Sequence, residues 1–200
     1  MCNLYRMDNS AAEVARMFGT EAPTGTNIAT EVFPGYPALV WDGAALRSMA
    51  WGFPLLRKGA KGQALKPRPV NNTRSDRLKS GFWRPSFETR RCLIPLTAFA
   101  EAQGPKGGKT RTWFSLPDQP VFTAGGLWRD SAEWGPVFSM IMTEACIHVA
   151  DIHDRMPVLI APEDRARWQE GTPHEAYDLC VPFAGPMTVD ATSQPWVAAR

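Results

Sequence analysis

The fold is decided by residues 91–143, RCLIPLTAFAEAQGPKGGKTRTWFSLPDQPVFTAGGLWRDSAEWGPVFSMIMT. Strand-like apolar runs follow one another closely here, with short turns at Gly104–Gly108 and Pro117–Gln119. Parallel neighbours would need crossovers of about a dozen or more residues, and these turns are too short for that. The spacing therefore predicts a mostly antiparallel sheet.

Further helices and strands are predicted along the rest of the chain. Ser10 and Glu13 form a capping-box pattern that predicts a short helix over about 11–18. Further helices are expected at 162–169 and 175–179, whereas the Gly-, Lys- and Pro-rich segment Lys58–Pro69 is expected to be a mobile loop. Strands are predicted at Ala38–Trp41, Leu46–Trp51, Cys92–Pro95, Thr112–Leu116, Val121–Leu127 and Val137–Thr143. We expect one α+β domain over residues 1–200, with a curled, barrel-like sheet and a few short helices.

Composition narrows the class of protein. The chain has 200 residues, 44% of them hydrophobic, which is ordinary for a globular domain. Its four cysteines form no CxxC pair, which argues against a disulfide framework and a structural zinc site, and we expect no metal and no cofactor. No apolar run is long enough for a membrane span and no secretory leader is evident, so a cytoplasmic monomer is expected.

Charge is distributed unevenly along the chain. Residues 46–112 contain 15 Lys and Arg but only three acids, whereas the remainder contains 7 basic and 17 acidic residues. Aromatic residues such as Trp51 and Phe82 are interleaved with these cations. Cations combined with stacking surfaces suit single-stranded nucleic acid, although a solvated cationic loop is the alternative.

The first two residues suggest a specific chemistry. Removal of Met1 would leave Cys2 with a free α-amine and a thiol on adjacent carbons. The amine has a pKa of roughly 7.7–8.0 and the thiol of about 8.5, and both are nucleophiles. Together they can attack one aldehyde twice, first to form an imine and then to close a thiazolidine ring.

Two polar clusters could assist such chemistry. In the segment 151–157, DIHDRMP, alternation along an extended chain would place Asp151, His153 and Arg155 on one face, where His153 can transfer protons beside an anion. Asn72 and Arg74 could jointly hold a phosphate or a sugar oxygen. The alternatives are a loop of salt bridges and a simple Asn-Asn turn.

Glu101 is a third candidate. It ends an apolar stretch, where a carboxyl group is expected to have a raised pKa and to act as a general acid or base. Alternatively, its charge balances Arg90 or Arg91.

These residues belong to an ordered set of motifs that covers roughly residues 1–160. The set is Cys2, Trp51-Gly52, Asn72-Thr73-Arg74, Arg91–Pro95 followed by Phe99 and Glu101, Ala124–Trp128, Thr143–Ala145 and Ile152–Pro157. In this combination the chain resembles the SOS-response-associated peptidase (SRAP) family, whose members crosslink to abasic sites in DNA. It departs from the family pattern at Asn3-Leu4, where Gly-Arg is usual, and at Leu55-Leu56, where aromatic residues are common.

The resemblance implies a DNA-damage-response protein whose partner is single-stranded DNA with abasic sites, bound at the nucleoid. Cys2 would form a thiazolidine with the ring-opened sugar, and Asn72 would position Cys2 or the sugar. Glu101 would shuttle protons, and His153 would assist ring opening. The phosphates would contact Arg74 and Arg155, with further DNA contacts from Trp51 and Arg77.

Other activities remain open. Abasic-site lyase activity could proceed through the imine, and the chain could remove its own Met1. The rival classes are an N-terminal-nucleophile cysteine peptidase or amidase and a non-covalent single-stranded DNA-binding module. The first would act on an amide instead of an aldehyde, and the second would not need Cys2.

Overall fold

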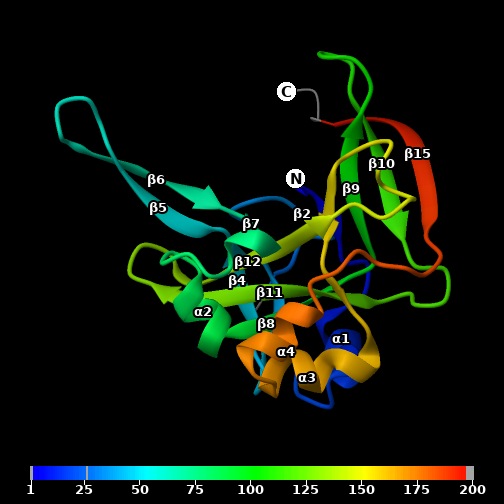
Figure 1. Cartoon of the computed structure of the whole chain (residues 1–200), viewed down its shortest axis with the longest axis horizontal. Helices are drawn as coiled ribbons and strands as arrows, with labels where there is room; N and C mark the ends of the chain where they lie inside the picture. The colour runs from blue at the N-terminus through cyan, green and yellow to red at the C-terminus, as the bar shows by residue number, and fades with distance from the viewer. Residues whose placement is uncertain (1, 26, 197–200) are drawn as a thin grey trace.

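A computed structural model describes residues 2–25 and 27–196, which fold as an α+β unit (Figure 1). Its centre is a closed barrel, in which each strand pairs with the next and β11 pairs with β12 to complete the ring. The spatial order is β12 (Gly135–Glu144), β4 (Leu46–Trp51), β3 (Pro37–Trp41), β8 (Arg91–Leu96) and β11 (Phe122–Ser131). Only the contact between β4 and β12 is parallel within this ring, so the predicted barrel-like, mostly antiparallel sheet is confirmed.

The barrel strands are buried on both faces. Successive side chains of a strand point to opposite faces, and on β12 Phe138 and Met140 join one core cluster while Val137 and Ile141 join another. The second cluster includes Trp168, which comes from the helices packed against the barrel. This two-sided burial explains why these strands read as nearly continuous apolar runs.

The helices are short and lie mainly along one side of the barrel (Figure 1). The predicted capping box is present, since the Ser10 side chain accepts from the Glu13 N–H and the Glu13 side chain accepts from the Ser10 N–H. A second capping box, formed by Thr172 and Glu175, begins the last helix. The helices are α1 (Ala11–Met17), α2 (Arg84–Thr89), α3 (Arg165–Glu170) and α4 (Pro173–Asp178), with 3₁₀ turns η1 (Ser75–Arg77) and η2 (Pro162–Asp164). None of the described helices is long and apolar enough to cross a lipid bilayer.

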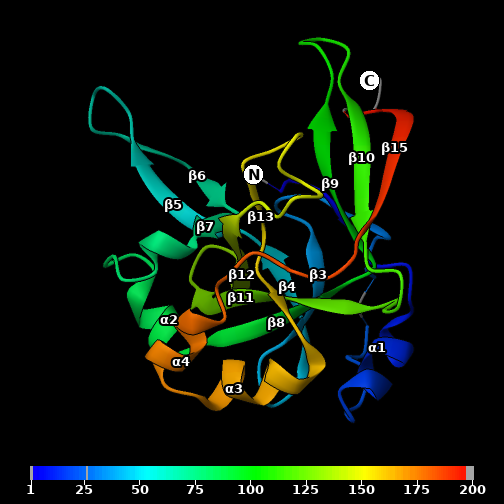
Figure 2. The same cartoon turned by 45° about the vertical axis from the view of Figure 1, so that its right-hand side comes forward.

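A second sheet stands beside the barrel (Figure 2). The chain passes into it at Thr97, directly after β8, and the N-terminal segment pairs with it. All its pairings are antiparallel. In spatial order its strands are β15 (Thr188–Pro195), β10 (Thr110–Ser115), β9 (Ala98–Gln103), β1 (Tyr5–Arg6) and β2 (Glu31–Val32).

Short strands flank β12 and bring distant segments together. Met142 of β12 pairs with Arg74 of β7 (Asn72–Arg74) and with Pro157 of β13 (Arg155–Pro157). A strand has two edges, so β7 and β13 lie on opposite sides of the same part of β12. A further strand, β14 (Leu159–Ile160), pairs with β11.

The prediction of a mobile loop at Lys58–Pro69 is wrong. Instead of a loop, most of it belongs to a hairpin of β5 (Phe53–Lys58) and β6 (Ala64–Val70), which projects from the body (Figure 1). Among the described strands, only β5 pairs with β6, so the opposite edge of β6 is unpaired. Pro67 and Pro69 can therefore lie in β6, because an N–H group on an unpaired edge takes no part in the ladder.

Candidate functional site

Cys2 lies in the interior of the protein. Its side chain is fully buried, and its Sγ donates a hydrogen bond to the Leu4 carbonyl at 3.4 Å. The same carbonyl accepts the Ala100 N–H at 2.9 Å, which ties the N-terminal segment to β9. Burial, and then the charge of Glu101, raise the pKa of the thiol far above its ordinary value. In this arrangement the thiol is protonated at neutral pH.

Two neighbouring asparagines hold the Cys2 main chain. The Nδ2 atoms of Asn72 and Asn71 donate to the Cys2 carbonyl at 2.5 and 3.2 Å. Asn71 also donates to the Asn3 side chain at 2.9 Å. The Asn72 side chain is buried, and its Oδ1 has no hydrogen-bond partner among the described residues. A buried acceptor without a partner is costly, so this oxygen is suited to receive a donor from a ligand.

Glu101 lies beside the thiol. It is on β9 opposite Thr112, and only 3% of its surface is exposed. Burial raises the pKa of its carboxyl group to about 7, and the nearby Asp154 charge raises it as well. A carboxyl group with this pKa can take up or release a proton at neutral pH. The alternative pairing with Arg91 is wrong, because the Arg91 guanidinium donates to main-chain carbonyls that include those of Trp168 and Phe87.

The segment 151–157 is arranged differently from its prediction. Asp151 lies in an exposed turn that precedes β13, so the expected alternation of Asp151, His153 and Arg155 on one extended face is wrong. His153 Nδ1 instead accepts the Arg155 N–H at 2.9 Å and lies 3.0 Å from an Asp154 oxygen. Burial lowers the pKa of His153, which favours the neutral ring at pH 7. Because Nδ1 accepts the Arg155 N–H, the neutral ring carries its proton on Nε2.

The arginines surround this centre. Arg74 forms a two-pronged ion pair with Asp76, and the charge of Asp154 adds to the rise in the pKa of Arg74. The Arg155 side chain is 19% exposed, and its positive charge helps to lower the pKa of Asp76. Arg77 is exposed at the end of η1. Arg74 and Arg155 therefore lie near Asp154 and His153.

The predicted contact of Trp51 with DNA does not agree with the position of its side chain. Its side chain is fully buried, its Nε1 donates to the Asn71 carbonyl at 2.8 Å, and its ring stacks on Phe138. Its faces are not available to DNA bases. Phe53 and Trp83 in the same basic region are buried too, so these aromatic residues build the core.

The structure thus brings Cys2, Asn72, Glu101 and His153 into one neighbourhood from four separate segments. The sequence analysis missed two members: Asn71, which directly precedes the Asn72-Thr73-Arg74 motif, and Asp154, which lies inside the 151–157 segment. In the sequence, Asn71 and Asp154 are marked by their position beside a candidate residue. This position does not distinguish a functional group from a turn residue. Among residues 2–25 and 27–196, no group of three or more His, Cys, Asp or Glu side chains could hold a metal ion.

These features define a class: an α+β barrel protein in which Cys2 is buried beside a carboxyl group of raised pKa. The model of the SOS response associated peptidase (SRAP) family matches residues 1–195, and the chain belongs to that family.

Curated relatives agree with this assignment. The abasic site processing protein YoqW of Bacillus subtilis is 27% identical over 62% of this chain, and the chain spans only 56% of that protein's length. The abasic site processing protein YoaM of the same organism is 29% identical over 73% of this chain and 68% of its own length.

Solved structures share the fold. A protein from Bordetella bronchiseptica superposes with a TM-score of 0.80 at 20% identity, covering 96% of this chain and 99% of its own. One from Bacteroides thetaiotaomicron has a TM-score of 0.79 at 19% identity, covering 95% and 91%.

Proposed function

We propose that this chain is a DNA-damage-response protein that, as a monomer, captures abasic sites in single-stranded DNA through Cys2. The observation that carries the proposal is the buried Cys2 thiol held beside Glu101, with its main chain fixed by Asn72. The names of the relatives YoqW and YoaM, abasic site processing proteins, indicate the substrate.

The reaction begins after removal of Met1. The Cys2 α-amine adds to the aldehyde of the ring-opened sugar, and the carbinolamine loses water to give an imine. The thiol then adds across the C=N bond: its sulfur bonds to carbon and its proton passes to nitrogen, which closes the thiazolidine. No oxidant or further reactant is required.

Glu101 and His153 supply the proton transfers. With a pKa of about 7, Glu101 can accept the amine proton and deliver one to the departing hydroxyl group. His153 is neutral, and its Nε2–H can donate to the sugar ring oxygen during opening. Asn72 Oδ1 provides an acceptor for the α-amine or a sugar hydroxyl group.

Two accompanying activities belong to the same proposal. From the imine, loss of a proton from the adjacent sugar carbon can expel the 3′ phosphate, which is an abasic-site lyase reaction. Removal of Met1 by the chain itself is favoured by the peptidase description of the family and by the burial of the thiol beside a proton acceptor.

Single-stranded DNA with one abasic site provides the test. Protein lacking Met1 should form an adduct that survives denaturing electrophoresis, and mass spectrometry should place the adduct on the Cys2 peptide. Cys2→Ala should give no stable adduct, although its amine can still form an imine that borohydride traps. Cys180→Ser serves as the control, because Cys180 is a free thiol outside the site.

Three results would contradict the mechanism. Undiminished stable crosslinking by Cys2→Ala would exclude the thiazolidine. Undiminished crosslinking by protein that retains Met1 would show that the α-amine is not required. Equal, purely non-covalent binding by wild type and Cys2→Ala would favour a binding module instead.

A further inference from the structure

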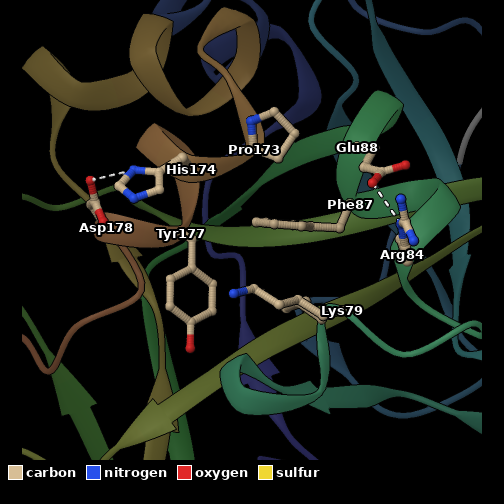
Figure 3. A pocket seen from close by; sticks show the side chains of 9 residues that line it. Lys79, Arg84, Phe87, Glu88, Pro173, His174, Tyr177 and Asp178 are labelled. Carbon is tan, nitrogen blue, oxygen red and sulfur yellow. Dashed lines mark hydrogen bonds and ion pairs between the residues drawn. The ribbon is translucent and has the colours of Figure 1, made fainter.

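A hollow of about 520 Å³ lies between α2, α4 and the residues that follow η1 (Figure 3). It is separate from the Cys2 site, whose residues do not line it. Its volume falls within the range of small-ligand pockets, roughly 300–1,000 Å³. The lining residues are Leu78, Lys79, Arg84, Phe87, Glu88, Pro173, His174, Tyr177 and Asp178.

The walls of this hollow suit a flat apolar group. Leu78 and Phe87 are buried and form apolar wall, while Tyr177 leaves 37% of its surface exposed. Tyr177 and Phe87 come from different helices and approach the same space (Figure 3). Aromatic faces of this kind stack on nucleobases with little dependence on sequence, because every base has a π-face.

The rim has one uncompensated charge, and it is positive. Glu88 forms an ion pair with Arg84 at 2.7 Å, and Asp178 forms one with Arg167 at 3.6 Å and also lies 3.3 Å from His174 Nδ1. The Lys79 ammonium lies over the Tyr177 ring, 5.1 Å from its centroid, and no described carboxylate forms an ion pair with it. An aromatic face beside a free cation matches a base that carries a phosphate.

The hollow is also close along the chain to the residues of the proposed DNA path. Lys79 follows Arg77 by two residues, in the segment that begins with Asn72 and Arg74. Seven residues span at most about 25 Å, so the hollow lies within a few nucleotides of the Cys2 site. A strand that passes Arg74 and Arg77 reaches Lys79 next.

We propose that this hollow binds one unpaired nucleotide of the same DNA strand, a few nucleotides from the abasic site. The base stacks against the exposed ring of Tyr177, with Leu78 and Phe87 as the apolar floor beneath it, and its phosphate contacts Lys79. This inference rests on the proposed function, because it requires abasic single-stranded DNA at the Cys2 site.

The test places 2-aminopurine, a fluorescent base, at each position from four nucleotides 5′ to four nucleotides 3′ of the abasic site. One position, or two adjacent ones, should change fluorescence on binding to wild-type protein. Tyr177→Ala should remove that response and weaken binding about fivefold or more, while Tyr177→Phe, which keeps the ring, should preserve both. Lys79→Ala should reduce the salt dependence of binding by about one phosphate contact.

The controls separate this inference from the proposed function. Val181→Ala removes an exposed apolar side chain outside the hollow and should behave as wild type. Adducts with no position-specific response, or a response that persists in Tyr177→Ala, would overturn the nucleotide pocket and leave Cys2 capture intact. Absence of any binding or adduct in wild type would instead overturn the proposed function.

Discussion

At the scale of single residues, the protonation of Glu101 controls the proposed chemistry. Its carboxyl group has a pKa of about 7 because it is buried. Glu101→Gln keeps the size of the side chain but removes the proton exchange, so crosslink formation and reversal should both slow by about 10²–10⁴-fold. DNA affinity should change little. Single-turnover kinetics at several pH values test this, and a wild-type rate in the variant would remove Glu101 from the mechanism.

The same carboxyl group should make stability depend on pH. Between pH 4.5 and about 7, the folded protein holds a proton that the unfolded chain has released. The free energy of unfolding therefore falls as pH rises through this window and levels off above it. The fall attributable to Glu101 is on the order of 3 kcal/mol.

Urea titrations of wild type and Glu101→Gln across this range measure the effect. The free energy of unfolding of the variant, measured relative to wild type, should increase between pH 4.5 and pH 7 and stay constant above pH 7. A difference that does not vary with pH would show that Glu101 titrates normally.

The sequence singled out several residues of the site, and their catalytic roles stay predictions. Cys2, Asn72 and Glu101 stood out because nucleophile, amide and apolar-flanked acid have recognisable contexts. Trp51 was assigned wrongly because interleaving with cations along the sequence does not reveal which face of a strand a ring occupies. In the structure it stacks on Phe138, a contact between residues 87 positions apart that no local pattern contains.

At the scale of elements, the exit from the barrel into the β5–β6 hairpin depends on Gly52. Its φ of +133° is a conformation that other residues rarely adopt, and a Cβ there would lie 2.5 Å from the Pro69 Cβ. Gly52→Ala should lower the free energy of unfolding by at least about 2 kcal/mol. Gly81→Ala is the control, because its Cβ would meet nothing within 4 Å, and it should stay within about 1 kcal/mol of wild type. Equal stability of both variants in urea would contradict this account.

Whether a helix or strand could be predicted depended on how clearly its sequence pattern reflects burial. The barrel strands and α1 were predicted because they are apolar runs with short turns and a capping box. β6 and β15 were missed because both are largely exposed and carry prolines or polar residues, so tertiary pairing alone makes them strands. The parallel pairings of β12 with β4 and β7 could not be predicted either, because they join segments that are far apart in the sequence.

At the scale of the whole molecule, opposite charges are separated along the chain, yet Asp76 and Asp154 lie among the site arginines. Arg74 is paired with Asp76 in the DNA-free protein. A phosphate must therefore compete with Asp76 for the same guanidinium group. In the proposed complex this competition would weaken the binding of a phosphate to Arg74.

The competition can be measured through salt dependence. Loss of one single-strand phosphate contact reduces the slope of log affinity against log salt by about 0.7. Arg74→Ala and Arg155→Ala should each weaken binding and reduce the slope by about this amount. Asp76→Asn should have the opposite effect and tighten binding, because it releases Arg74 for the phosphate. Arg16→Ala, in the last turn of α1, is the matched control and should leave affinity and slope unchanged. If the Arg74 and Arg155 variants keep the wild-type slope, these arginines do not contact the phosphates, and the positive charge around the site is only a solvated surface.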